Sequence, residues 1–366
     1  MHRMMEVDKY KESAQTAYAA ARKWTAVGRA GFSTGAVNYT SLALDSRGTP
    51  YVAYQDAGNN YRATVMKYEE GQWTEVGCVG VSVAQAGYLS LALDGSGTPY
   101  VAYTDIENHF KATVMKYEEG QWTAVGNSGF SVGEAYYLSL ALDASGTPYV
   151  AYMDVENHFK ATVMKYEEGQ WTAVGCVGVS AGAAYSLDLV LDARGMPYVA
   201  YMDVENNYRA TVMKYEEDQW IEVGRSGVSA GAAYSLSLAL DAQDNPYVAY
   251  MDVENNYRTT VMKYEEGQWL EVGRAGVFAG AACSLSLALD TQDTPYVAYQ
   301  DVENNYRATV MRYEEGQWTT VGRAGFSAGQ ASSPSLAMDR SGSPYVAYKD
   351  GMSGDKATVY RVMENK

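Results

Sequence analysis

A short segment recurs along this 366-residue chain and combines a carboxylate, an aromatic ring and a cation within seven positions. In one copy Asp203 begins the segment and Tyr208 and Arg209 end it, with a glutamate and two asparagines between them. Aromatic faces stack on the C–H surfaces of sugars, and planar polar groups hydrogen-bond to hydroxyl groups. The segment therefore indicates a ligand site, repeated for multivalent binding, formed by Asp105, Phe110, Lys111, Asp203, Tyr208, Arg209, Asp252, Tyr257, Arg258, Asp301, Tyr306 and Arg307.

The same segment is open to two other interpretations. Its aspartate can bond to amides of the loop in an Asx-type turn and pair locally with the basic residue. Its aspartate, glutamate and asparagine oxygens are also calcium ligands, although no twelve-residue calcium loop is present. The residue types alone do not decide between a sugar site, a turn and a calcium site, so no metal ligand is assigned.

Paired glutamates are a second candidate for chemistry, because two carboxylates perform the acid–base work of glycoside hydrolases. Here the two glutamates of a pair are adjacent turn residues repeated in six copies, at 69–70, 118–119, 167–168, 216–217, 265–266 and 314–315. Six like pairs argue against one tuned acid–base couple, and we interpret them as a solvated rim. With three histidines and three cysteines in the chain, the sequence predicts a protein that is not an enzyme and needs no cofactor.

The elements that must position these residues follow a strict repeat. The seven tryptophans are spaced 49 residues apart, at Trp24, Trp73, Trp122, Trp171, Trp220, Trp269 and Trp318. A period of this length is typical of propellers and solenoid arrays. Within one unit, residues 41–45, 51–54, 62–68 and 73–76 read as short strands separated by turns rich in Gly, Pro and Asn. Because no helical period is present, the pattern predicts an all-β, seven-bladed propeller of four-stranded antiparallel blades.

The phase of the repeat predicts how the ring closes. The segment that begins at Trp24 has no strands of its own before it, and residues 333–363 supply only three strands. We expect residues 24–28 to complete the last blade, so that residues 24–366 form one propeller without open edges. Residues 1–23 lie outside the repeat and are expected to be a helical or disordered lead-in.

The unit resembles a kelch repeat in one stretch. Tyr51-Val-Ala-Tyr54 is followed by a strand that ends at Tyr68, and after a turn Trp73 opens the outer strand, as in that family. The kelch Gly-Gly pair is missing, since Tyr54-Gln55-Asp56 stands in its place. The near-identity of the units looks like a recently amplified propeller. The resemblance implies the architecture and says almost nothing about the function.

In such a blade, one face of the ring carries the loop between the second and third strands and the link to the next blade; we call it the top face. The links differ from blade to blade while the blade body is nearly invariant. A surface that differs in each blade suits one asymmetric partner, although neutral drift in permissive loops gives the same pattern. The candidate partner-binding residues at the channel mouth are Arg29, Tyr137, Asp188, Arg225, Arg274 and Arg323.

These observations predict a non-catalytic platform that binds a protein partner through the top face and the channel mouth. The alternative is a lectin-like protein that binds glycans through the repeated Asp–aromatic–basic loops. A formal charge of −16 disfavours general binding to nucleic acids. No apolar run is long enough for a membrane span, no signal peptide is recognised and few cysteines are present. We therefore expect a monomeric, cytoplasmic protein without membrane contact.

Overall fold

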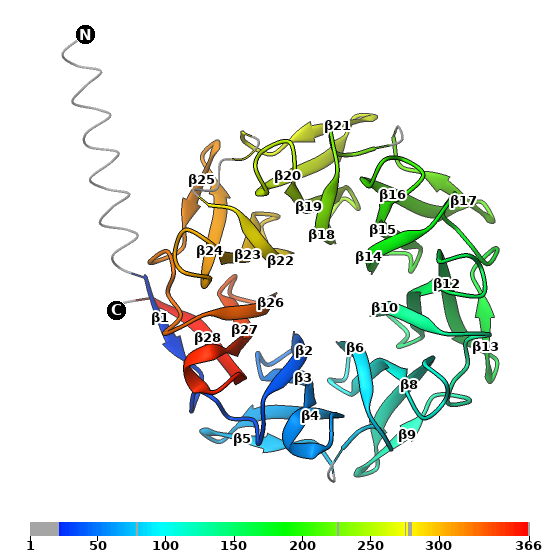
Figure 1. Cartoon of the computed structure of the whole chain (residues 1–366), viewed down its shortest axis with the longest axis horizontal. Coiled ribbons are helices and arrows are strands. Elements are labelled where there is room, and N and C mark those ends of the chain that lie inside the picture. The colour runs from blue at the N-terminus through cyan, green and yellow to red at the C-terminus, as the bar shows by residue number, and fades with distance from the viewer. Residues whose placement is uncertain (1–21, 78–79, 225–226, 275, 277–279, 365–366) are drawn as a thin grey trace.

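The computed structural model describes residues 22–77, 80–224, 227–274, 276 and 280–364. Seven four-stranded antiparallel sheets stand around a common axis, with one strand of each at the inside of the ring (Figure 1). The first four blades, each given from the inner to the outer strand, are the following. Blade 1 has β2 (Val37–Leu44), β3 (Pro50–Asp56), β4 (Arg62–Glu69) and β5 (Gln72–Glu75). Blade 2 has β6 (Ala86–Leu93), β7 (Pro99–Asp105), β8 (Lys111–Glu118) and β9 (Gln121–Ala124). Blade 3 has β10 (Ala135–Leu142), β11 (Pro148–Asp154), β12 (Lys160–Glu167) and β13 (Gln170–Ala173). Blade 4 has β14 (Ala184–Leu191), β15 (Pro197–Asp203), β16 (Arg209–Glu216) and β17 (Gln219–Glu222).

The remaining three blades have the same order. Blade 5 has β18 (Ala233–Leu240), β19 (Pro246–Asp252), β20 (Arg258–Glu265) and β21 (Gln268–Glu271). Blade 6 has β22 (Ala282–Leu289), β23 (Pro295–Asp301), β24 (Arg307–Glu314) and β25 (Gln317–Thr320). Blade 7 has β26 (Ala331–Met338), β27 (Pro344–Asp350), β28 (Lys356–Glu364) and, as its outer strand, β1 (Arg22–Ala26). Two short 3-10 turns, Ala57–Asn59 and Gly351–Ser353, follow β3 and β27.

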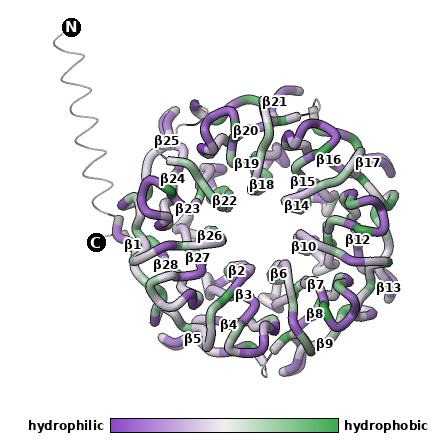
Figure 2. The backbone as a smooth tube through the Cα atoms, viewed as in Figure 1, coloured by the Kyte–Doolittle hydropathy of each residue, from purple (hydrophilic) through white to green (hydrophobic). Residues whose placement is uncertain are grey.

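The second strand of each blade is the most buried element. In β3, every residue from Pro50 to Asp56 is buried, because blades pack against both faces of this strand. Proline fits at the first position, where it breaks no interior ladder bond. Figure 2 shows hydrophobic residues concentrated in the strands and hydrophilic residues at the loops. The core therefore lies between neighbouring blades.

Ring closure is confirmed. Strand β1 pairs with β28, with Trp24 opposite Val362. The Trp24 indole Nε1 donates to the Val321 carbonyl of the neighbouring blade at 2.8 Å, and each of the other six tryptophans makes the same bond to its own neighbour. The first strand thus occupies the position that the sequence left open, and it starts two residues before the predicted boundary. The predicted lead-in lies almost entirely outside the described residues and stays a prediction.

Candidate functional site

The predicted top-face loops connect the second and third strands of each blade, and their aspartates face inward. Asp105, Asp203, Asp252 and Asp301 are between 1% and 6% exposed. In blade 5, the Asp252 carboxylate accepts bonds from the Asn255 side chain at 2.7 Å, from Thr260 Oγ1 at 2.9 Å and from the Glu254 amide at 3.1 Å. This geometry fits the turn interpretation and removes the four aspartates from direct contact with a ligand.

The loop aromatics, in contrast, face solvent. Phe110, Tyr208, Tyr257 and Tyr306 are between 39% and 49% exposed. All four have φ between 60° and 61°, a left-handed conformation that is rare for a bulky side chain. Two backbone hydrogen bonds hold this conformation. In blade 4 the Tyr208 amide donates to Asp203 O, and Tyr208 O accepts from the amide of Ala233, the first residue of β18 in the next blade.

The basic residues of these loops begin the third strand and are half-buried. Lys111, Arg209, Arg258 and Arg307 all lie at this position, and Arg258 Nη1 donates to Gly276 O at 3.5 Å. Within the described part of the chain, none of them forms an ion pair with the aspartate of its own loop. The local Asp–Arg pair expected from the sequence is therefore not formed, and each base packs under the link instead.

The five candidate residues of the channel mouth that the structure describes do not form one surface. Arg29, Arg274 and Arg323 directly follow the outer strands β1, β21 and β25 and are exposed. Tyr137 and Asp188 belong to the inner strands β10 and β14, a full blade width away. Placing Arg29, Arg274 and Arg323 at the mouth was wrong, because the link starts at the periphery and only then crosses to the axis. Arg225 lies outside the described residues.

Asp188 belongs to a ring of hydrogen bonds between inner strands. In the other blades a serine at this position accepts from a leucine amide of the next blade, as Ser90 does from Leu140 at 3.0 Å. The Asp188 carboxylate accepts from the Leu238 amide in the same way, at 2.8 Å, and it also accepts from the hydroxyls of Ser139 and Ser237. Burial raises the pKa of the Asp188 carboxyl, and the four hydrogen bonds it accepts oppose this shift. Its contacts are therefore with neighbouring blades.

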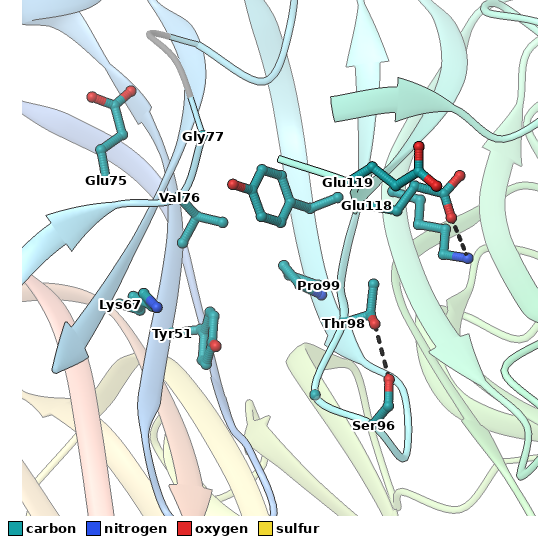
Figure 3. Close-up of a pocket in the computed structure, with 13 residues that line it drawn as sticks. Tyr51, Lys67, Glu75, Val76, Gly77, Ser96, Thr98, Pro99, Glu118 and Glu119 are labelled. Atoms are coloured by element: carbon teal, nitrogen blue, oxygen red, sulfur yellow. Dashed lines mark hydrogen bonds and ion pairs between the residues drawn. The ribbon is translucent and has the colours of Figure 1, made fainter. Parts of the chain in front are cut away.

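A recurring cleft on the opposite, bottom face was missed by sequence reasoning. Between blades 1 and 2 its volume is about 470 Å³; Tyr51, Lys67 and Glu75 lie on one wall, and the Ser96–Pro99 turn with Glu118 lies on the other (Figure 3). Equivalent clefts of about 450 and 360 Å³ lie between blades 2 and 3 and between blades 5 and 6. Each is lined by the tyrosine of the second strand, the lysine of the third strand and the threonine of the next blade's turn, in the sets Tyr51, Lys67 and Thr98; Tyr100, Lys116 and Thr147; and Tyr247, Lys263 and Thr294.

The polar groups of the cleft are held in place. Lys116 pairs with Glu118 at 2.8 Å, and this hydrogen bond raises the pKa of the lysine. The ammonium group also lies 5.6 Å from the centre of the Tyr100 ring, within the range of a cation–π contact. Cation, carboxylate, hydroxyl and ring are thereby fixed at one site. The first glutamate of each pair, interpreted from sequence as a solvated rim, is the partner of this lysine in five blades and of Arg312 in blade 6.

Among the described residues, no three histidine, cysteine, aspartate or glutamate side chains are grouped so that they could hold a metal ion. None of the described helices has the length and apolar character needed to cross a membrane.

No known family model matches the chain, and no curated protein sequence matches it. Solved structures share its fold at low identity. A polysaccharide lyase, PL25 ulvan lyase, is 13% identical with a TM-score of 0.62, over 92% of this chain and 96% of the other. The Aleuria aurantia lectin bound to Fucα1-6GlcNAc is 14% identical with a TM-score of 0.52, over 81% and 99%. AofleA from Arthrobotrys oligospora is 13% identical with a TM-score of 0.51, over 83% and 91%.

These comparisons support the propeller and leave the kelch resemblance unconfirmed. They also correct one prediction. The sequence was interpreted as that of a protein that is not an enzyme, but a polysaccharide lyase shares the fold over nearly the whole chain. That exclusion was wrong, because the propeller architecture carries catalysts as well as lectins.

Proposed function

We propose that the protein binds carbohydrate, several molecules per chain, in the clefts between blades on the bottom face. The observation that carries this proposal is that one set of side chains recurs at three junctions: a tyrosine, a Lys–Glu pair and a threonine hydroxyl. Volumes of about 360–470 Å³ are in the range of small-molecule sites. Like sites on one rigid ring give avidity for a surface that repeats the same sugar.

The charges of the cleft indicate which sugars it accepts. Glu75, Glu118 and Glu119 border the cleft between blades 1 and 2, and its two lysines are already paired, Lys67 with Glu69 and Lys116 with Glu118. The whole chain carries a net charge of −16. An acidic cleft on an acidic protein repels sulfated and uronate sugars. We therefore expect neutral or amino sugars to bind in preference to acidic ones.

The shared fold of the Aleuria aurantia lectin supports the proposal as an analogy of architecture. A protein partner at the channel mouth is less supported, since Arg29, Arg274 and Arg323 follow the outer strands β1, β21 and β25. The top-loop aromatics remain a competing place for the sugar, because they are exposed and repeated.

One pair of variants separates the two faces. Lys116 and Lys111 lie on the same strand, β8, at its bottom and top ends. A glycan array probed with the wild type should show neutral or amino sugars binding, and K116M should weaken that binding while K111M leaves it unchanged. The reverse result would place the sugar in the top loops. Silence of the wild type on the array would reject carbohydrate binding.

A further inference from the structure

Four tyrosines form a continuous row on the inner strands of blades 1 to 4, at their top ends. We call Tyr39, Tyr88, Tyr137 and Tyr185 the tyrosine arc. Their ring centroids lie 5.1 Å (Tyr39–Tyr88), 5.0 Å (Tyr88–Tyr137) and 5.9 Å (Tyr137–Tyr185) apart. Each ring therefore contacts the ring of the next blade, and the strands that carry them, β2, β6, β10 and β14, stand next to one another around the axis (Figure 1).

The arc is confined to one half of the ring. At the position of Tyr39, Tyr88 and Tyr137, the other four blades carry a serine: Ser186, Ser235, Ser284 and Ser333. The blade body is otherwise nearly invariant, so this position is one of the few at which the two halves of the molecule differ. One arc gives one site, in contrast to the repeated clefts.

The tyrosines of the arc occupy a position at which a serine can bond to the next blade. Tyr39, Tyr88 and Tyr137 have φ of 54°, 46° and 53°, and the serines of the other half share this left-handed backbone, with Ser186 at 54°. In the other half, Ser186 Oγ accepts from the Leu236 amide at 3.0 Å and joins two blades. A tyrosine carries its hydroxyl at the far end of its ring and not on Cβ, so it cannot make that bond. Partly exposed aromatics that replace such a stabilising bond indicate binding.

The residues beside the arc on its own strands are uncharged. Those just before it on the same four strands are Asn38, Gly87, Tyr136 and Ala184. Two charged groups that contact these residues are engaged: Glu134 accepts from the Tyr136 hydroxyl at 2.6 Å, and Lys349, which donates to Asn38, lies 3.5 Å from Asp355. Aromatic faces and phenol hydroxyls without free charge suit a neutral ligand that presents both C–H faces and hydroxyl groups.

We propose that the tyrosine arc is a single binding site for a curved, neutral oligosaccharide. The ligand must be curved because the arc is curved: a straight oligosaccharide would contact two of the rings and then diverge from the others. An α-linked glucan bends in the required way and a β-linked glucan does not. The site lies on the face opposite the clefts and is independent of them.

Isothermal titration with maltohexaose and cellohexaose tests this proposal. We expect maltohexaose to bind with one site per chain and cellohexaose to bind at least about tenfold more weakly. Y88S and Y137S should each lower the affinity for maltohexaose at least about tenfold, a loss of about 1.4 kcal/mol. Both variants install the residue that four blades already carry, so the fold is retained.

Y234S is the matched control, because Tyr234 is an exposed tyrosine on the inner strand of blade 5 outside the arc, and it should leave the affinity unchanged. K116M should also leave it unchanged, which separates this site from the clefts. Unaltered binding in Y88S and Y137S, equal affinity for the two glucans, or no binding of maltohexaose would overturn the proposal. So would a proline-rich peptide that binds the arc more tightly than maltohexaose, because aromatic rows also accept polyproline helices.

Discussion

Ring closure by Trp24 predicts a large loss of stability in W24A. The Trp24 side chain is 7% exposed, stacks on Phe326 at 4.0 Å and donates to Val321 O at 2.8 Å. Truncation of such a buried tryptophan costs about 3–5 kcal/mol, of which the hydrogen bond supplies about 1 kcal/mol. W24A should therefore lose about 3–5 kcal/mol of unfolding free energy, and W24F, which keeps a ring for stacking, about 1–2 kcal/mol.

Trp171 provides the matched comparison within the same chain. It stacks on Phe130 at 4.0 Å and donates to Val125 O at 2.8 Å, the same contacts in a blade that does not close the ring. Urea unfolding followed by circular dichroism should give similar losses for W24A and W171A. A W24A protein as stable as the wild type, beside a destabilised W171A, would refute closure by the N-terminal strand.

Three further predictions concern single positions. Burial raises the folded-state pKa of Asp188 above 3.8, so the contribution of its protonated form to stability is present at low pH and is lost as the pH rises through that pKa. Relative to D188S, the wild type should therefore gain unfolding free energy as the pH falls from 7 to about 4. The same pH dependence of the unfolding free energy in both proteins would contradict this. Y208G relieves the left-handed strain of a residue that is 44% exposed and should raise the stability by about 1 kcal/mol in thermal unfolding; a lower melting temperature would argue against strain. S90A leaves the Leu140 amide without its acceptor and should cost about 1–3 kcal/mol, whereas a neutral effect in urea unfolding would show that the inner ring of bonds contributes nothing.

The architecture could be predicted from the sequence because it depends on local, repeated signals. The tryptophan spacing predicted the length and number of the blades. The unpaired segment at Trp24, together with only three strands after Ser333, predicted the closure of the ring. Each signal is a strand or turn propensity copied seven times, so even weak preferences added up. The turn interpretation of Asp252 was also within reach, since aspartate before a tight loop bonds to its amides.

The site could not be predicted to the same extent, because its parts come from different blades. The cleft between blades 1 and 2 joins Lys67 to Thr98, which are 31 residues apart and belong to different sheets. The position of Arg29 depended on where the link crosses the blade, which its composition does not encode. In the sequence, the tyrosines of the arc are only positions that vary among the blades. Ring contacts such as that between Tyr88 and Tyr137 show that they form one continuous row.

The most direct test of the proposed function is the number of sugar sites per chain. Equilibrium titration of the intact protein, with the monosaccharide that binds best on the array, should give at least three sites, one for each described cleft. Lys116 lines the clefts on both sides of blade 2, and Lys263 lines the cleft between blades 5 and 6. K116M should therefore weaken two sites and K263M one. A single site in the wild type, or a site number and affinity unchanged by both variants, would contradict carbohydrate binding in the clefts.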